Sequence, residues 1–391
     1  MNLILRPRLR VNALRIAVWA FALLLLTTAP DSSLLKASAL SSACKVDLSF
    51  LGKGIGGPLT HLIEFVDDNT LAVAIVVHNP GSPKLVRRGN FEENSAFFLR
   101  AALLNANTGQ VLKQADWPTG FPRHSALITA VNSELLVLLG NRVALYGDNL
   151  ELLKQLQLPG NNRDVWVGRA SPSGKNALFI ENAGLKPATW AWVDATHLRV
   201  LRVWRSVPPQ PGGQGTPISD HYITFTQCLP PGGRPPCKLK VQSLDGNSVR
   251  TVAGIDLHHG SPEFVADNVL FVHGWSGDIS IVNLVKHRAI RHRSPGFFGD
   301  DFGSAVSAPG AARFVVPVFS REFGLEYLYI FDGPSAHLRV LSIHGMPSVE
   351  PVRLFTVFPR GFALSPDGKL LAVIENFRTL LVFRLPPLKG H

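Results

Sequence analysis

Eight polar residues have the types and the spacing to form a binding site. The set comprises His61, Arg123, His124, Arg163, Asp164, Asp300, Asp301 and Arg360. The segments Pro122-Arg-His-Ser-Ala-Leu127 and Pro359-Arg-Gly-Phe-Ala-Leu364 are aligned copies, so their arginines would stand at equivalent heights in a repeated structure. Guanidinium groups bind carboxylates and phosphates through a planar fork of donors. We therefore expect an anionic ligand, unless these arginines and aspartates instead pair with one another.

Metal and enzyme chemistry receive less support from the sequence. Asp300 and Asp301 are adjacent carboxylates, but an oxygen site for a divalent cation needs six or more ligands from several loops. We expect no cofactor and assign no metal ligand, although a divalent cation remains possible. The chain has no Gly-x-Ser-x-Gly elbow, no His-Glu-x-x-His pair and no glycine-rich phosphate loop with lysine. No catalytic residue is predicted, and whether the protein is an enzyme stays open.

The three cysteines fit an oxidising compartment. Cys228 and Cys237 flank Leu-Pro-Pro-Gly-Gly-Arg-Pro-Pro, which cannot form a helix, and two adjacent strands would bring the ends of this loop together. The sequence predicts a disulfide between these two residues. Cys44 is left without a partner.

The elements that must position these residues are short strands in a repeat. An apolar strand, an Asp/Asn/Gly turn and a second alternating strand recur seven times, as in Val193-Asp-Ala-Thr-His-Leu-Arg-Val-Leu201 and Phe331-Asp-Gly-Pro-Ser-Ala-His-Leu-Arg-Val-Leu341. The turns recur at intervals of 38 to 52 residues, the signature of a β-propeller. Second strands are predicted to begin near Leu71, Leu135, Ala177, Tyr222, Leu270, Phe314 and Leu371.

Two first-to-second-strand turns have nearly the same sequence. They are Ser171-Pro-Ser-Gly-Lys175 and Ser365-Pro-Asp-Gly-Lys369, in which Pro and Gly pre-set the backbone. With these turns the chain resembles the WD40-like and YVTN-type propeller superfamily, especially the exported bacterial branch that is similar to the periplasmic TolB propeller. The resemblance implies an architecture and carries over no catalytic residue. Val193-Asp194 and Phe331-Asp332 stand where strict WD40 repeats have Trp-Asp.

We expect an all-β, seven-bladed propeller of four-stranded antiparallel blades, a single domain over residues 40–391. The last unit lacks an outer strand because Pro386 and Pro387 follow its third strand. The segment from Cys44 to Phe50 alternates correctly to fill this place and close the ring. A six-bladed ring with a malformed first unit is the alternative.

Blade connectivity sorts the loops between two faces. Turns from first to second and from third to fourth strands are short, whereas the other connections hold the long insertions. These run from His78 to Ala96, Ala115 to His124, Ser206 to Ser219, Leu229 to Pro236, Ser294 to Gly303, Phe319 to Glu326 and His344 to Val352. Long loops on a rigid scaffold commonly carry binding, so this face is the predicted functional one.

The N-terminal segment predicts export. Four arginines precede an apolar run from Ile16 to Ala29, too short to span a bilayer, and Ala37-Ser38-Ala39 is a small-x-small cleavage site. Residues 1–39 are therefore expected to be a signal peptide, which leaves no transmembrane segment and a periplasmic or extracellular protein. Without this segment the formal charge falls from +11 to +7. Scattered basic residues on an exported chain argue against nucleic acid as partner.

Two functions remain. The first is a noncatalytic exported scaffold that binds a protein, peptide or glycan on the long-loop face. The alternative is a hydrolase or lactonase-like propeller enzyme with its site at the mouth of the central channel. The sequence does not fix the ligand or the oligomeric state.

Overall fold

The computed structural model describes the chain from Ser42 onward, with gaps. The described ranges are 42–52, 61–78, 97–119, 126–159, 166–181, 187–206, 218–228, 237–246, 248–257, 262–273, 278–293, 301–302, 305–308, 313–320, 324–333, 337–342, 361–375 and 378–388. The chain separates into two units, Met1–Ser38 and Ala39–His391, and the described residues all belong to the second. Within the described ranges no helix has the length and apolarity to cross a membrane.

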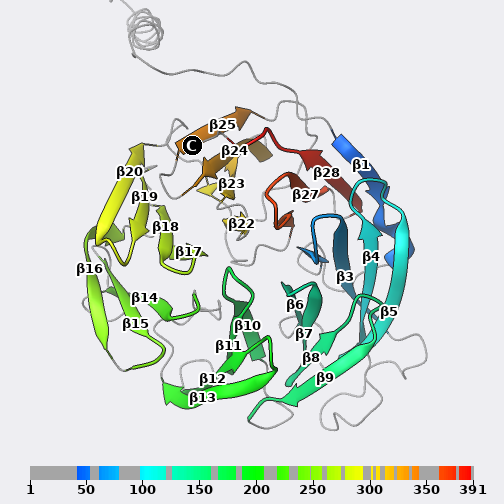
Figure 1. Ribbon diagram of the computed structural model, residues 1–391, viewed down its shortest axis with the longest axis horizontal. Helices are drawn as coiled ribbons and strands as arrows, with labels where there is room; N and C mark the ends of the chain where they lie inside the picture. Colours follow the sequence, from blue (N-terminus) through cyan, green and yellow to red (C-terminus); the bar gives the residue numbers. More distant parts are fainter. Residues whose placement is uncertain are drawn as a thin grey trace, which may run out of the picture. The chain divides into compact units, whose positions relative to one another are not determined.

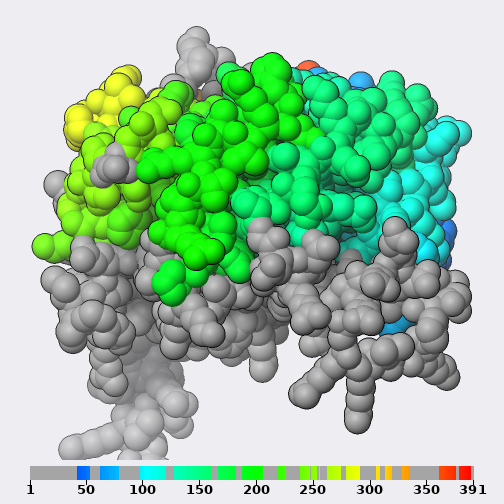
Figure 2. All heavy atoms as spheres, turned by 90° about the horizontal axis from the view of Figure 1, so that it is seen from below, coloured from blue at the N-terminus to red at the C-terminus, as the bar shows by residue number. Residues whose placement is uncertain are grey.

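Seven antiparallel sheets form a ring in the second unit, as Figure 1 shows. Blade 1 contains β2 (His61–Phe65), β3 (Thr70–His78), β4 (Phe97–Asn105) and β5 (Val111–Thr119). Blade 2 contains β6 (Ala126–Val131), β7 (Glu134–Leu139), β8 (Arg142–Tyr146) and β9 (Leu152–Gln157). Blade 3 contains β10 (Trp166–Ala170), β11 (Asn176–Glu181), β12 (Ala188–Asp194) and β13 (Arg199–Ser206). In Figure 2 the outer surfaces of blades 2 and 3, in green, lie side by side.

The remaining blades vary the same plan. Blade 4 contains β14 (Tyr222–Cys228), β15 (Cys237–Ser243) and β16 (Val249–Leu257), and a single bridge from Ile218 to Ile223 takes the innermost place. Blade 5 contains β17 (Pro262–Ala266), β18 (Val269–His273), β19 (Asp278–Asn283) and β20 (Arg288–Arg293). Blade 6 contains β21 (Asp301–Phe302), β22 (Val306–Ala308), β23 (Arg313–Ser320), β24 (Gly324–Asp332) and β25 (His337–Ser342).

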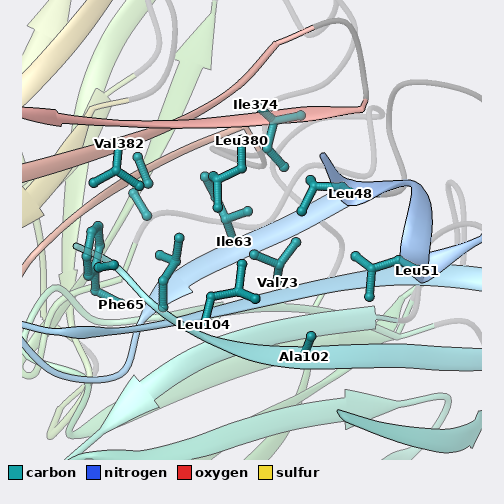
Figure 3. Packing of buried hydrophobic residues seen from close by; sticks show 14 of the residues in the cluster. Leu48, Leu51, Ile63, Phe65, Val73, Ala102, Leu104, Ile374, Leu380 and Val382 are labelled. Carbon is teal, nitrogen blue, oxygen red and sulfur yellow. The ribbon is translucent and has the colours of Figure 1, made fainter. Parts of the chain in front are cut away.

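Blade 7 joins the two ends of the domain. It contains β26 (Phe362–Leu364), β27 (Leu370–Glu375) and β28 (Thr379–Arg384), and β1 (Ser42–Asp47) pairs with β28 as the outer strand. The predicted closure and the seven-bladed ring are thus confirmed, and the six-bladed alternative is wrong. The 3-10 helix η1 (Leu48–Leu51) follows β1 and buries Leu48 and Leu51 in the apolar layer between blades 7 and 1, where they meet Ile63, Leu380 and their neighbours (Figure 3).

Apolar layers between neighbouring sheets hold the ring together. Middle strands are buried on both faces, so β3 and β27 are apolar at nearly every position rather than alternating. Trp190 and Trp204 are cross-strand partners within blade 3 and stack with ring centroids 5.6 Å apart. Such burial contributes about 25 cal/mol for each Å² of apolar surface removed from water.

The two predicted Ser-Pro-x-Gly-Lys turns are confirmed. The Gly174 and Gly368 amides donate to the carbonyls of Ser171 and Ser365, and both glycines have φ near +70°. A Cβ at Gly174 would lie 2.5 Å from the Ala130 carbonyl oxygen of blade 2. Glycine is thus required there both by the backbone torsion and by the close approach of the neighbouring blade.

Two connections are shorter than the sequence suggests. β5 continues through Thr119, because Trp117 is buried opposite Leu99 and stacks on Tyr146 of blade 2 with centroids 4.2 Å apart. The predicted loop from Ala115 to His124 therefore begins only after residue 119. Likewise β23 reaches Ser320 and β24 begins at Gly324, so the predicted loop from Phe319 to Glu326 is mostly strand.

Candidate functional site

A cavity of about 500 Å³ occupies the central channel. Its wall is built from the innermost strands β2, β6, β10, β17, β22 and β26. It extends to the first-to-second-strand turns of blades 1, 2, 3 and 7, represented by Asp67, Asn132, Ser173 and Pro366. The cavity therefore reaches the face of the short turns, opposite to the face predicted to be functional.

Glu64 is the ionisable residue of β2 that lines this cavity. Its Oε1 accepts a long hydrogen bond of 3.5 Å from the amide of Ala130 on β6, and its carboxyl group also bonds the Thr129 side chain. The side chain is half-buried because it borders the channel, yet the ring encloses it on the other sides. This burial raises the pKa of Glu64 to about 7, against the smaller opposing effect of the two hydrogen bonds.

Glu263 on β17 makes the corresponding contact with the next blade, but its charge is balanced. Its Oε2 accepts from the amide of Ala305, just before β22, and its Oε1 lies 3.3 Å from the Arg169 guanidinium of β10. Arg169 thereby joins blade 3 to blade 5, past the short inner segment of blade 4. Among the described residues Glu64 has no such cationic partner.

Polar side chains link neighbouring blades on the short-turn face. The Ser173 hydroxyl of blade 3 donates to the Asp220 carboxylate of blade 4 at 2.7 Å. The Asp220 amide donates in turn to Asp267 of blade 5 at 2.9 Å, and the Asp367 amide of blade 7 donates to Asp68 of blade 1 at 2.8 Å. These contacts fix the rim of the cavity by cross-linking one turn to the next.

Most of the site predicted from the sequence lies outside the described residues. Arg123, His124, Arg163, Asp164, Asp300 and Arg360 are in this group. The backbone is described for His61, which begins β2 opposite Ile75, and for Asp301, which pairs with Phe319 at the start of β21. The clustering of these eight residues and the anionic ligand stay predictions. Among the described residues, no group of three or more His, Cys, Asp or Glu side chains is arranged to hold a metal ion.

The strand bounds confirm that the two faces differ in loop length. Innermost strands begin, and second strands end, on the face that receives the longest connections, which span residues 79–96, 207–217, 229–236, 294–300 and 343–361. On the opposite face the turns are short, such as 66–69 between β2 and β3 and 132–133 between β6 and β7. We call the first face the long-connection face.

The predicted cysteine pair is opposite in register. Cys228 ends β14 and Cys237 begins β15, and the two are direct antiparallel partners. Directly opposite residues have Cα atoms about 4.5–5.5 Å apart, within the range that a disulfide bridges. The disulfide itself stays a prediction. Cys44 is free, and burial raises the pKa of its thiol.

Sequence reasoning missed Glu64, Glu263 and Arg169. Each is a charged residue in a short, mostly apolar inner strand, and both glutamates stand directly before a phenylalanine. That exception to the apolar pattern is the signal that would have identified them. Their partners lie on other blades and carry no local signature.

Comparison with known proteins shows the fold. No family model matches the chain, and no curated protein matches it. A solved structure described as "Crystal Structure of Mitotic Checkpoint Complex" contains a chain similar to this one, with 14% sequence identity and a TM-score of 0.52. The match covers 92% of this chain and 97% of that one. The fold is that of a β-propeller.

Proposed function

We propose that this protein is an exported, noncatalytic propeller scaffold that binds a protein or peptide partner on its long-connection face. The observation that carries the proposal is the contrast between the two faces. Short turns cross-linked from blade to blade form one face, while the longest connections all leave from the other. A rigid ring that displays long loops on one side is an arrangement suited to macromolecular recognition.

The fold comparison supports a macromolecular partner. The similar solved chain is part of a structure whose title names a complex. The connection over residues 79–96 joins β3 and β4, the two middle strands of blade 1, whose central residues are buried. Its anchor points are consequently rigid, which lowers the entropy lost on binding at this face.

Export to the periplasm or the cell exterior is part of the proposal. It rests on the basic and apolar segment before Ala39 and on the cross-strand cysteines at positions 228 and 237, whose pairing would need an oxidising compartment. Mass spectrometry of the protein recovered from the exported fraction tests both features at once. A mature N-terminus near residue 40 and a 228–237 linked peptide support export, whereas an intact Met1 and free thiols contradict it.

Site-specific photo-crosslinking tests the binding face. A photoreactive residue is placed at Val86 or Gly212 in the long connections, and at Asn149 or Lys286 in short turns as matched controls. The proposal predicts partner adducts from the first two positions and none from the controls. Adducts from the short turns alone would place recognition on the opposite face. Glycan adducts at Val86 or Gly212 would support the long-connection face as the binding face but would show that the partner is a glycan rather than a protein.

A further inference from the structure

Among the described residues, the Glu64 carboxylate in the central cavity has no cationic partner. Glu64 meets an amide and a hydroxyl from β6, and within the described ranges it forms no ion pair. The other charged residues that line the cavity are Asp67, Asp68 and Arg169, and Arg169 is already paired with Glu263. An enclosed charge without a partner is electrostatically unfavourable. The lining therefore has an unfilled requirement for a cation.

The rest of the lining specifies which kind of cation fits. The residues include Phe65, Phe264 and Phe362 together with aliphatic side chains of the inner strands. The lining combines these apolar residues with polar ones such as Thr129, Asn132 and Ser307, and a cavity near 500 Å³ has the size typical of sites for small organic ligands. The lining matches an amine with an apolar body better than a hydrated metal ion.

We propose that the central channel, at its short-turn end, is a binding site for a small organic amine whose ammonium group pairs with Glu64. The ammonium group replaces the weak 3.5 Å contact to the Ala130 amide as the main interaction of the carboxylate. The Thr129 hydroxyl, already bonded to Glu64, is a second polar group at this point of the wall. This site differs in place and in charge from the anionic site expected on the long-connection face.

Calorimetric titration with three isosteric probes tests the proposal. Phenethylamine, 2-phenylethanol and 3-phenylpropionate have similar apolar bodies and are a cation, a neutral molecule and an anion. We expect saturable binding of phenethylamine to the full chain at pH 8, and at least tenfold weaker binding of the other two. Absence of saturable binding of the amine, or equal binding of the alcohol, would overturn the proposal.

Two variants test the role of Glu64. Glu64→Gln keeps the size and hydrogen-bonding capacity of the side chain but removes its charge, and should weaken amine binding at least tenfold. Glu134→Gln is the control, because Glu134 begins β7 beside the cavity rim and is outside its lining. Its affinity should stay within twofold of the wild type. Equal losses in both variants would indicate a general field effect and contradict a specific pair.

The wild-type protein provides a test that does not depend on any variant folding. Phenethylamine stays protonated between pH 5 and pH 8, whereas Glu64 must ionise to pair with it. Because the pKa of Glu64 is about 7, the affinity should be constant above that pH and fall about tenfold for each unit below it. Asp67 and Asp68 also line the cavity, so an affinity that stays constant as the pH falls through 7 would refute the role of Glu64 and leave these two carboxylates as the candidates for the pairing.

Discussion

Arg313 and Asp332 form a buried ion pair that ties blade 6 to blade 7. Arginine Nε lies 2.7 Å from aspartate Oδ1, and the two side chains are 1% and 5% exposed. The same guanidinium donates to the carbonyl oxygens of Gly368 and Pro386, at 2.6 and 3.0 Å. One side chain thereby holds a turn of blade 7 and the segment that leaves its last described strand.

Removal of this arginine should destabilise the whole ring. Arg313→Ala leaves the Asp332 carboxylate buried without its charge partner, and breaking a buried pair from one side costs about 3–5 kcal/mol. Arg100→Ala is a suitable control, because the Arg100–Asp116 pair is 30% and 39% exposed and should contribute at most about 1 kcal/mol. Urea unfolding of both variants measures the difference. Similar losses in the two would contradict the importance of burial.

The closing strand and the helix after it should be required for a monomeric ring. A chain beginning at residue 52 lacks β1, Leu48 and Leu51, and burial of the two leucines alone contributes about 3–6 kcal/mol. It also leaves the edge of β28 unpaired, which favours association between molecules. We expect a lower Tm and dimers or larger species in size-exclusion chromatography, compared with a chain beginning at residue 40. An unchanged elution profile and Tm would argue against closure by β1.

The pH dependence of stability should report on Glu64. Its pKa is raised from 4.5 to about 7, so between these values the folded protein binds a proton that the unfolded chain does not. The free energy of unfolding consequently falls, by about 3 kcal/mol in total, as the pH rises from 4.5 to 7. Above pH 7 it should stay constant. Glu64→Gln should lack this slope and be more stable than the wild type at pH 8. If urea unfolding gives the wild type and Glu64→Gln the same pH dependence of stability, the raised pKa of Glu64 is refuted.

The predicted disulfide should stabilise the β14–β15 hairpin. Cys228→Ser should lower the free energy of unfolding by roughly 2–3 kcal/mol in oxidising buffer, from the chain-entropy model for a short loop. Addition of a thiol reductant should remove the difference from the wild type. Cys44→Ser serves as the control: it keeps both cysteines of the pair, so reductant should lower its stability by as much as it lowers that of the wild type. A wild-type stability that ignores reductant would show that no disulfide forms.

The arginines expected on the long-connection face can be tested together. Arg123→Ala combined with Arg360→Ala should abolish binding of an anionic probe such as citrate or inorganic phosphate while leaving Tm within about 2 °C. Thermal-shift titration gives both quantities. A large fall in Tm without ligand would show that the arginines pair with neighbouring aspartates, as the alternative interpretation holds.

The architecture could be predicted because each strand is defined by its own local pattern. β3 begins at Thr70 and β27 at Leu370, each one residue before the predicted start, since apolar runs bounded by Asp, Asn, Pro and Gly set both ends. The strand ends on the long-connection face were harder to predict from the sequence. Only the packing of Trp117 against a different blade explains why β5 continues to Thr119.

The channel chemistry could not be predicted for a related reason. Glu64 meets Ala130, 66 positions later, and Arg169 reaches Glu263 past an entire blade. A single charged residue in an apolar strand indicates that its side chain has a polar partner or faces solvent. It does not say whether the partner is another strand, a ligand or water, because that depends on how the blades are arranged around the axis.

The pairing of β1 with β28 also determines the order of events during synthesis. Val46 pairs with Leu380, so β1 acquires its partner only after more than 300 further residues have been added during synthesis. At about 5–20 residues per second this delay is on the order of 15–60 s. During that time β1 must remain soluble without its partner strand. Its sequence SACKVD contains one large aliphatic residue and two charged ones, which favours solubility. The translating chain is therefore an open arc, and it becomes a ring only at the last step.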